Sequence, residues 1–233
     1  MLFPEFAGPE RWLPLLQRHW QLIEAAAPRV RVTSVPAGEA VRRHYAECVE
    51  LWRLAESDAF NGPLVDIGSG GGWPGLVVAI LEPDREVHLV EPLKKRARLL
   101  EELRDALELG NVAVHAERAE EAGHGPLRER AGLVTARAVA ELAVLLEYAA
   151  PFARIGGTLV FPRGSGARET DRATIAGGVA GTTGCAFVNA TPMRAAISEN
   201  LAVLRFVKVA ATPELLPRRP GVPTRKPLNG SGA

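Results

Sequence analysis

Cysteine is scarce in this chain, and no long run of apolar residues occurs in it. Cys48 and Cys185 are the 2 cysteines among 233 residues, too few for a disulfide framework and too far apart for a metal-binding motif. We expect both to be buried as small apolar side chains, and we expect no metal site. No run approaches the roughly 18 apolar residues of a membrane span, and the N-terminus lacks the pattern of a signal peptide. These absences favour a cytoplasmic protein that has no membrane partner.

A large excess of charge is absent as well. The formal net charge is +1, and the chain is 47% hydrophobic and 24% charged, as in an ordinary globular protein. Any binding to nucleic acid must therefore come from local basic patches rather than from the overall charge. The length suits one well-buried domain with an additional element or two.

Glycine, by contrast, is concentrated in the stretch LVDIGSGGGWPG at residues 64–75. The first four residues predict a short buried strand, and an apolar helix is expected after the glycines. Glycines at such a junction let the backbone turn sharply and lie close to a ligand, which the first N–H groups of the helix then face. This arrangement is typical of a nucleotide-type binding loop.

Two cofactor classes fit this loop. Gly70, Gly72 and Gly75 satisfy the pattern G-x-G-x-x-G, and Glu91 follows at about the 20-residue spacing found in dinucleotide-binding folds. A dinucleotide-binding oxidoreductase is therefore one hypothesis.

The same stretch also contains the pattern D-x-G-x-G-x-G, the first motif of S-adenosylmethionine methyltransferases, formed by Asp66, Gly68, Gly70 and Gly72. We favour this second interpretation. An acid at the strand end is unfavourable beside a pyrophosphate, whereas a sulfonium cofactor with an amino-acid moiety tolerates it.

From residue 64 onward, predicted strands alternate with predicted helices, which indicates parallel strands joined by right-handed crossovers. The expected strands are residues 64–67, 86–90, 112–115, 133–136, 157–161, 185–190 and 201–209. The expected helices are residues 9–27, 39–54, 74–81, 93–109, a weak one around Leu127, 141–152 and 169–180.

These elements predict an α/β fold of the Rossmann-like class I methyltransferase type. Its sheet has seven strands, mostly parallel, with an antiparallel hairpin at one edge. We assign residues 1–60 to an N-terminal helical flank, 61–212 to the S-adenosylmethionine-binding domain and 213–233 to a tail rich in proline and arginine.

Ligands of open α/β sheets lie beyond the carboxyl ends of the strands. Glu91, after the second strand, is suited to accept hydrogen bonds from ribose hydroxyls. Ala119 and Glu120, after the third, could line an adenine, although a solvated acid fits the spacing nearly as well. Arg137, after the fourth, could bind a carboxylate or phosphate or form a structural salt bridge.

Five strings in this order make the chain resemble the bacterial glucose-inhibited division protein B family. They are LVDIGSGGGWPGL, VEPLKKRARLLEEL, ERAEE, TARAVAEL and PRRPGVPTRKPL, and the resemblance covers about residues 41–228. The family methylates nitrogen 7 of a guanine in small-subunit ribosomal RNA. The resemblance implies that S-adenosylmethionine would be contacted by Gly68, Trp73, Glu91, Ala119, Glu120 and Arg137. It also implies 16S ribosomal RNA as the partner, either free or assembled in the small subunit.

The chain departs from the family pattern in three places. Arg31-Val32-Thr33 replaces Asn-Leu-Thr, His44 to Cys48 replaces His-Phe-x-Asp-Ser, and Phe161-Pro162-Arg163-Gly164 replaces Leu-Lys-Gly. The first and third departures involve residues that could contact the RNA.

The chemistry that the resemblance implies needs no catalytic base, because nitrogen 7 of guanine has a free lone pair and carries no proton. The candidate RNA-binding residues are Arg163 and, in the tail, Arg218, Arg219, Arg225 and Lys226. The prolines of the tail favour an extended arm whose basic side chains stay available. A methyltransferase for a small molecule is the other alternative; it would not need this tail.

Overall fold

The computed structural model describes residues 8–55, 62–165 and 168–229. Its centre is one seven-stranded sheet with the order β3-β2-β1-β4-β5-β7-β6. The strands are β1 (Leu64–Ile67), β2 (Val87–Val90), β3 (Val112–His115), β4 (Ala131–Ala136), β5 (Ala153–Gly164), β6 (Cys185–Pro192) and β7 (Leu201–Lys208). Strands β1 to β5 are parallel, and β7 pairs antiparallel with both β5 and β6. The predicted sheet and its antiparallel edge hairpin are confirmed.

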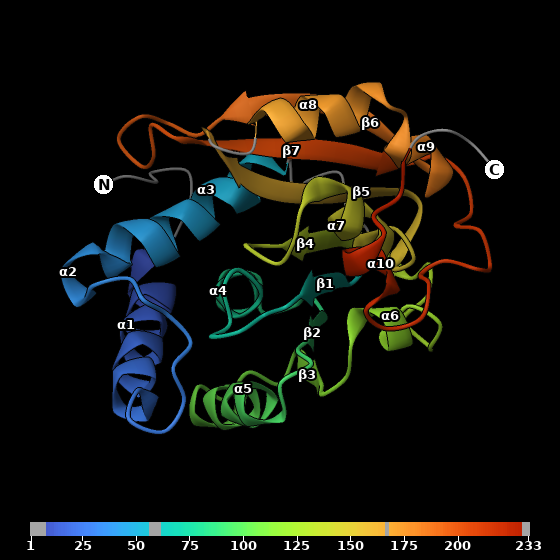
Figure 1. Ribbon diagram of the computed structural model, residues 1–233. Coiled ribbons are helices and arrows are strands. Elements are labelled where there is room, and N and C mark those ends of the chain that lie inside the picture. The colour runs from blue at the N-terminus through green and yellow to red at the C-terminus, as the bar shows by residue number, and fades with distance from the viewer. Residues whose placement is uncertain (1–7, 56–61, 166–167, 230–233) are drawn as a thin grey trace.

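Helices cover both faces of the sheet (Figure 1). One face carries the N-terminal helices together with α4 and α5, and the other carries α6 to α10. Their bounds are α1 (Pro9–Ala26), α2 (Ala37–Ala40), the π-helix η1 (Val41–Ala46), α3 (Glu47–Leu54), α4 (Gly75–Leu81), α5 (Lys94–Ala106), α6 (Ala119–Ala122), α7 (Leu142–Ala149), α8 (Arg168–Ala176), α9 (Val179–Thr182) and α10 (Val222–Arg225).

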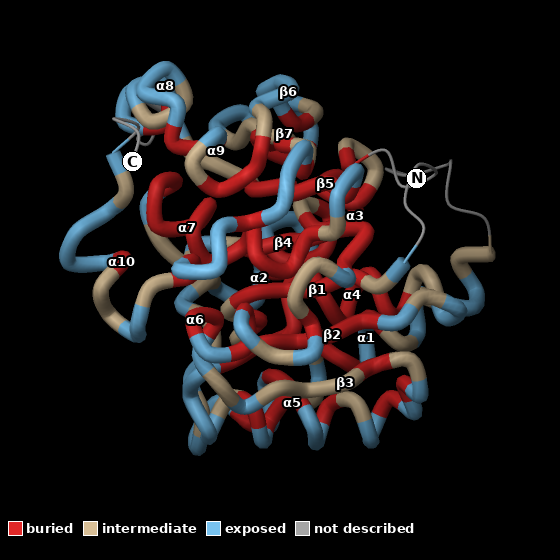
Figure 2. The backbone as a smooth tube through the Cα atoms, turned by 90° about the vertical axis from the view of Figure 1, so that its right-hand side faces the viewer, coloured by how far each residue is buried: buried red, intermediate tan, exposed pale blue. Residues whose placement is uncertain are grey.

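Successive side chains of a strand point to opposite faces of the sheet, so each strand contributes to a hydrophobic core on both faces. On β1, Leu64 packs into the cluster beneath α1, α3 and α4, whereas Val65 and Ile67 pack into the cluster beneath α7. A strand covered on both faces must be apolar on both, which is why β1 and β4 are buried along their whole length (Figure 2). Asp66 is the acid in this otherwise apolar strand, and it is fully buried.

Two of the expected helices take another form. The weak helix around Leu127 is absent, and residues 123–130 form turns after the short α6, because Gly123, Gly125 and Pro126 interrupt any helix there. The helix expected over residues 169–180 breaks into α8 and α9 at Gly178, which has a φ of 77°.

The C-terminal tail differs from the expected extended arm. Leu216 and Pro223 are buried against the domain, and the tail contains the short helix α10. Apolar residues spaced between the prolines and arginines give the tail a face to bury, so it packs instead of projecting.

Three further findings bear on the sequence expectations. Cys48 and Cys185 are both buried and free, as predicted. Among the helices of the described ranges, none combines the length and apolar character needed to cross a membrane. The described residues also contain no group of three or more histidine, cysteine or acidic side chains arranged to hold a metal ion.

Candidate functional site

The glycine loop between β1 and α4 is built so that side chains would not fit at most of its positions. A Cβ added to Gly68 would lie 2.7 Å from a methyl group of Val139, and one added to Gly72 would strike Leu76. Gly70 differs, because its Cβ would have open space, with the carbonyl oxygen of Gly68 as the nearest atom at 3.8 Å. The backbone is therefore packed from behind and open at Gly70, as a loop that receives a ligand should be.

Asp66 supports this loop from below. Its Oδ2 accepts a hydrogen bond of 3.2 Å from the N–H of Gly75, and its Oδ1 accepts one of 2.8 Å from the Thr135 hydroxyl. Burial raises the pKa of Asp66 to about 6, against the opposing effect of these hydrogen bonds. The structure places the Asp66 carboxylate behind the loop, where it fixes the turn, and not on the open side.

Glu91 joins the loop to the end of β2. Its Oε2 accepts a hydrogen bond of 2.9 Å from the N–H of Gly70, and its Oε1 accepts one of 2.9 Å from the N–H of Leu93. Each carboxylate oxygen has a second lone pair, so these bonds leave acceptors for two hydroxyl groups. The carboxylate thus lies beside the open position of the loop, where the ribose role predicted for it would require it.

Trp73 is the centre of an aromatic cluster. Its ring stacks on His44 with the centroids 3.9 Å apart, and the rings of His19 and Tyr45 meet it edge to face. Trp73 is only 6% exposed. In this arrangement it packs the loop against the N-terminal helices.

His19 locks this cluster to the loop. Its Nε2 lies 2.9 Å from the carbonyl oxygen of Gly71, and its Nδ1 lies 2.8 Å from the Tyr45 hydroxyl. A carbonyl can only accept, so Nε2 carries the proton and Nδ1 accepts from Tyr45. Burial lowers the pKa of His19 to about 4, which keeps the ring neutral in this role.

Arg137 points to the N-terminal flank. Its guanidinium donates to the carbonyl oxygen of Arg43 at 3.0 Å and to Nδ1 of His44 at 2.8 Å. Burial, together with the charges of Arg137 and Arg43, lowers the pKa of His44 to about 3. Arg137 therefore ties the end of β4 to η1, and its ion pair with Glu47 at 3.8 Å corresponds to the structural salt bridge considered for it from the sequence.

The tail lies against the predicted adenine position. Glu120, in α6 directly after Ala119, is 4% exposed, and its Oε1 accepts a hydrogen bond of 3.0 Å from the N–H of Gly221. Ala119 is 6% exposed. The tail thus packs against α6 at the predicted adenine position, a contact that the sequence did not predict.

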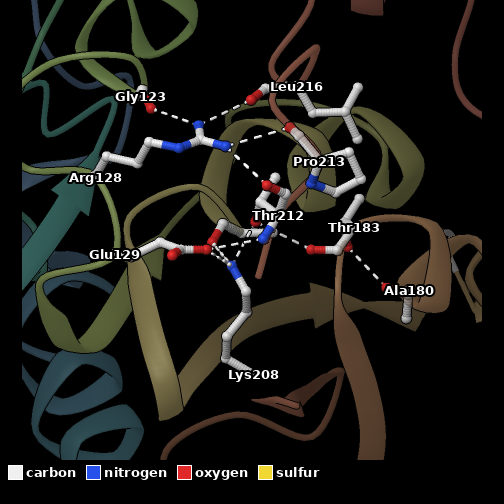
Figure 3. A network of polar contacts seen from close by, with 10 residues as sticks. Gly123, Arg128, Glu129, Ala180, Thr183, Lys208, Thr212, Pro213 and Leu216 are labelled. Atoms are coloured by element: carbon white, nitrogen blue, oxygen red, sulfur yellow. Dashed lines mark hydrogen bonds and ion pairs between the residues drawn. The ribbon is translucent and has the colours of Figure 1, made fainter. Parts of the chain in front are cut away.

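A polar network anchors the start of this tail (Figure 3). Arg128 donates to the carbonyl oxygens of Leu216 at 2.9 Å and Thr212 at 2.9 Å. Beside it, the buried ammonium group of Lys208 donates to Thr212 and lies 3.3 Å from a carboxylate oxygen of Glu129. These contacts fix the chain before it turns toward α10.

Two of the predicted RNA-binding arginines are engaged inside the protein. Arg218 forms a two-pronged contact with the fully buried Glu147, at 2.8 Å from Nε and 2.6 Å from a terminal nitrogen. Arg163 pairs in the same way with Asp171, at 2.9 Å for each nitrogen. Both guanidinium groups therefore hold segments of the fold together. Arg219, Arg225 and Lys226 are exposed.

The comparisons with known proteins identify the family. Residues 13–176 match the family described as rRNA small subunit methyltransferase G. A protein of that name from Roseiflexus castenholzii is 38% identical over 225 residues, which are 94% of this chain and 93% of that one. The protein so named from Chloroflexus aggregans is 39% identical over 189 residues, 81% of this chain and 78% of that one. This chain belongs to the rRNA small subunit methyltransferase G family. The family resemblance stated from the sequence is confirmed.

Solved structures agree on the fold. A mutant of MtNAS in complex with S-adenosylmethionine superposes with a TM-score of 0.58 at 16% identity, covering 85% of this chain and 73% of that one. A mutant of the 16S rRNA (adenine(1408)-N(1))-methyltransferase from Catenulisporales acidiphilia gives a TM-score of 0.54 at 20% identity, covering 70% of this chain and 91% of that one. Identities this low support the fold alone. Together with membership of the family, this fold excludes the dinucleotide-binding oxidoreductase that the glycine pattern also allowed.

Proposed function

We propose that this protein transfers a methyl group from S-adenosylmethionine to nitrogen 7 of a guanine in 16S ribosomal RNA. The observation that carries the proposal is similarity to a ribosomal RNA small subunit methyltransferase G over 94% of the chain. The glycine loop and Glu91, at the carboxyl ends of β1 and β2, lie where a fold of this class receives its cofactor.

The residues of the loop fit an adenosine-type cofactor. Gly70 leaves open space at the loop surface, and Glu91 keeps free lone pairs for ribose hydroxyls. Asp66 and His19 act behind the loop by fixing its turn and its contact with α1. S-adenosylmethionine would supply an electrophilic methyl group: the lone pair of guanine nitrogen 7 forms the new bond to the methyl carbon as the carbon–sulfur bond breaks, and S-adenosylhomocysteine leaves.

No proton leaves nitrogen 7 during this transfer, so the protein needs no general base. The contribution of the site is then to align the two reactants and to exclude water. Alignment of this kind can account for about 7–11 kcal/mol of the activation barrier. The rigid support of the loop by Asp66, Glu91 and the Trp73 cluster suits that task.

The RNA partner calls for phosphate contacts, for which Arg219, Arg225 and Lys226 are exposed on the docked tail. We take the assembled small subunit in the cytoplasm as the substrate, because a rigidly docked basic surface suits a target of fixed shape.

Transfer of a labelled methyl group tests the proposal. Small subunits that lack the modification, and matched subunits that already carry it, are incubated with the protein and labelled S-adenosylmethionine. We expect label on the first set alone, recovered as 7-methylguanosine by mass spectrometry of the nucleosides. No transfer by a protein that binds S-adenosylhomocysteine would reject the ribosomal substrate and favour a small-molecule methyltransferase.

A further inference from the structure

A cavity of about 510 Å³ opens at the carboxyl ends of β4 and β5. Arg137 and Ala138 line it after β4, and Pro162 lines it at the end of β5. The adjoining residue Val139 is packed so closely behind Gly68 that a Cβ on that glycine would lie 2.7 Å from it. The cavity and the loop are therefore neighbours at the same edge of the sheet, and a volume of this size holds a nucleotide.

Two carboxylates line this cavity: Glu39, which pairs with Arg43 at 3.3 Å and is 46% exposed, and the more buried Glu47, the first residue of α3. The Glu47 side chain is 12% exposed and forms an ion pair with a terminal nitrogen of Arg137 at 3.8 Å, a separation beyond hydrogen-bond length. That guanidinium already donates to Arg43 and His44. Within the described part of the chain, no group donates a hydrogen bond to Glu47. Burial accordingly raises its pKa, although the nearby arginines oppose the shift.

A mostly buried carboxylate that accepts no hydrogen bond from the described residues is able to bind a ligand that brings donors. The Watson–Crick edge of guanine offers two adjacent donors, N1–H and the N2 amino group, which match the two oxygens of a carboxylate. Adenine and cytosine place an acceptor at the corresponding ring nitrogen, and uracil flanks its single N–H with carbonyls. Glu47 would therefore bind guanine and repel the other bases.

We propose that the cavity at the ends of β4 and β5 holds the target guanine and that Glu47 recognises its N1–H and N2 amino groups. The inference rests on the function proposed above, and it assigns the preference of the enzyme for guanine to Glu47. Arg42 and Arg43 are exposed and line the same cavity, and Arg43 also pairs with Glu39; these two arginines would contact the phosphates of the bound nucleotide.

This contact would strengthen during the reaction. Methylation at nitrogen 7 puts positive charge on the purine, which makes N1–H a better donor to a carboxylate. An interaction that is stronger in the transition state than in the ground state increases kcat and not only binding. Glu47 would therefore contribute to rate as well as to selection of the base.

The variants Glu47→Gln and Glu47→Asp test the assignment, with Glu102→Gln on the exposed surface of α5 as the matched control. We expect Glu47→Gln to lower kcat on unmodified small subunits by about 10- to 100-fold, the range expected for loss of a two-pronged base contact. Glu47→Asp should restore part of the rate. The affinity for S-adenosylhomocysteine and the melting temperature should match those of Glu102→Gln.

Nucleotide binding provides a readout apart from activity. NMR titrations of the protein saturated with S-adenosylhomocysteine compare GMP, IMP, which lacks the amino group, and AMP. We expect the affinities to fall in that order and the preference to disappear in Glu47→Gln. Equal binding of GMP and AMP, no GMP-dependent shift at residues 42–47, or an unchanged kcat in Glu47→Gln would overturn the assignment. If the unaltered protein methylates no guanine in small subunits, the proposed function itself fails.

Discussion

The N–H of Gly75 donates a hydrogen bond of 3.2 Å to the fully buried carboxylate of Asp66. This bond joins the first residue of α4 to β1 across the glycine loop, and the hydroxyl of Thr135 on β4 holds the other carboxylate oxygen at 2.8 Å. The loop is therefore held in shape from inside the sheet, before any ligand contributes.

The buried Asp66 makes the stability of the protein depend on pH. Folding raises its pKa from 3.8 to about 6, so its stabilising contribution is complete below pH 3.8 and is lost as the pH rises through 6. Relative to Asp66→Asn, the natural protein should lose about 2 kcal/mol of unfolding free energy between pH 4 and pH 7. Urea unfolding of both proteins at the two pH values measures this difference, and parallel behaviour of the two proteins would contradict it.

His19 should have the opposite effect. Folding lowers its pKa from 6.5 to about 4, so its contribution is complete above pH 6.5 and is lost as the pH falls toward 4. Compared with His19→Gln, the natural protein should lose about 2 kcal/mol of unfolding free energy between pH 7 and pH 5. Denaturant unfolding followed by tryptophan fluorescence tests this. A difference between the two proteins that stays constant with pH would mean that the ring is not buried as a neutral group.

The sheet and the cofactor loop could be predicted from local signals. A mainly apolar run such as residues 64–67, followed directly by glycines, predicts a buried strand and the ligand loop after it from fewer than ten residues. The ends of β5 were less predictable, since it runs from Ala153 to Gly164 through Gly156 and Gly157, where a strand is not expected to continue.

The partners of the arginines could not be predicted in the same way. Arg218 meets Glu147 across a sequence separation of 71 residues, and nothing in the tail distinguishes Arg218 from its exposed neighbour Arg219. A partial signal did exist, because Glu147 is the one acid in the apolar stretch LAVLLEYAA and a buried acid needs a partner. The convergence of His19, Tyr45 and Trp73 likewise depends on how α1 packs, which periodicity alone does not specify.

Adjacent arginines in the tail provide a matched pair of variants. Arg218→Ala leaves the Glu147 carboxylate buried without its cation and should lower the unfolding free energy by roughly 3 kcal/mol. Arg219→Ala, at an exposed position, should change it by no more than about 0.5 kcal/mol. Thermal and urea unfolding of the two variants and of the natural protein measure these differences in unfolding free energy. Similar stabilities for both would show that the pairing of Arg218 with Glu147 contributes little.

Two glycines of the loop should respond differently to alanine. Gly72→Ala introduces a side chain at a φ of 95° against Leu76, and should destabilise the fold by roughly 3 kcal/mol. Gly70→Ala adds a methyl group in open space at a φ of 56°, which should cost only about 1 kcal/mol. That methyl group would occupy the side of the loop that the ligand's atoms approach closely. We therefore expect Gly70→Ala to fold but to bind S-adenosylhomocysteine more weakly by at least about tenfold, as measured by calorimetry. Unchanged binding would place the ligand elsewhere.

The exposed basic residues of the tail should act on RNA through charge alone. Arg219, Arg225 and Lys226 are exposed, and removing a side chain that binds a phosphate should lower the slope of log affinity against log salt by about 1. The triple variant to alanine should therefore bind unmodified small subunits more weakly at low salt and with a slope smaller by up to about 3. Its unfolding free energy and its affinity for S-adenosylhomocysteine should stay unchanged, since none of these three side chains holds the tail in place as Arg218 does. A triple variant with an unaltered salt slope would remove the docked tail from the RNA interface and leave the rim arginines of the cavity, Arg42 and Arg43, as the cationic side chains to test next.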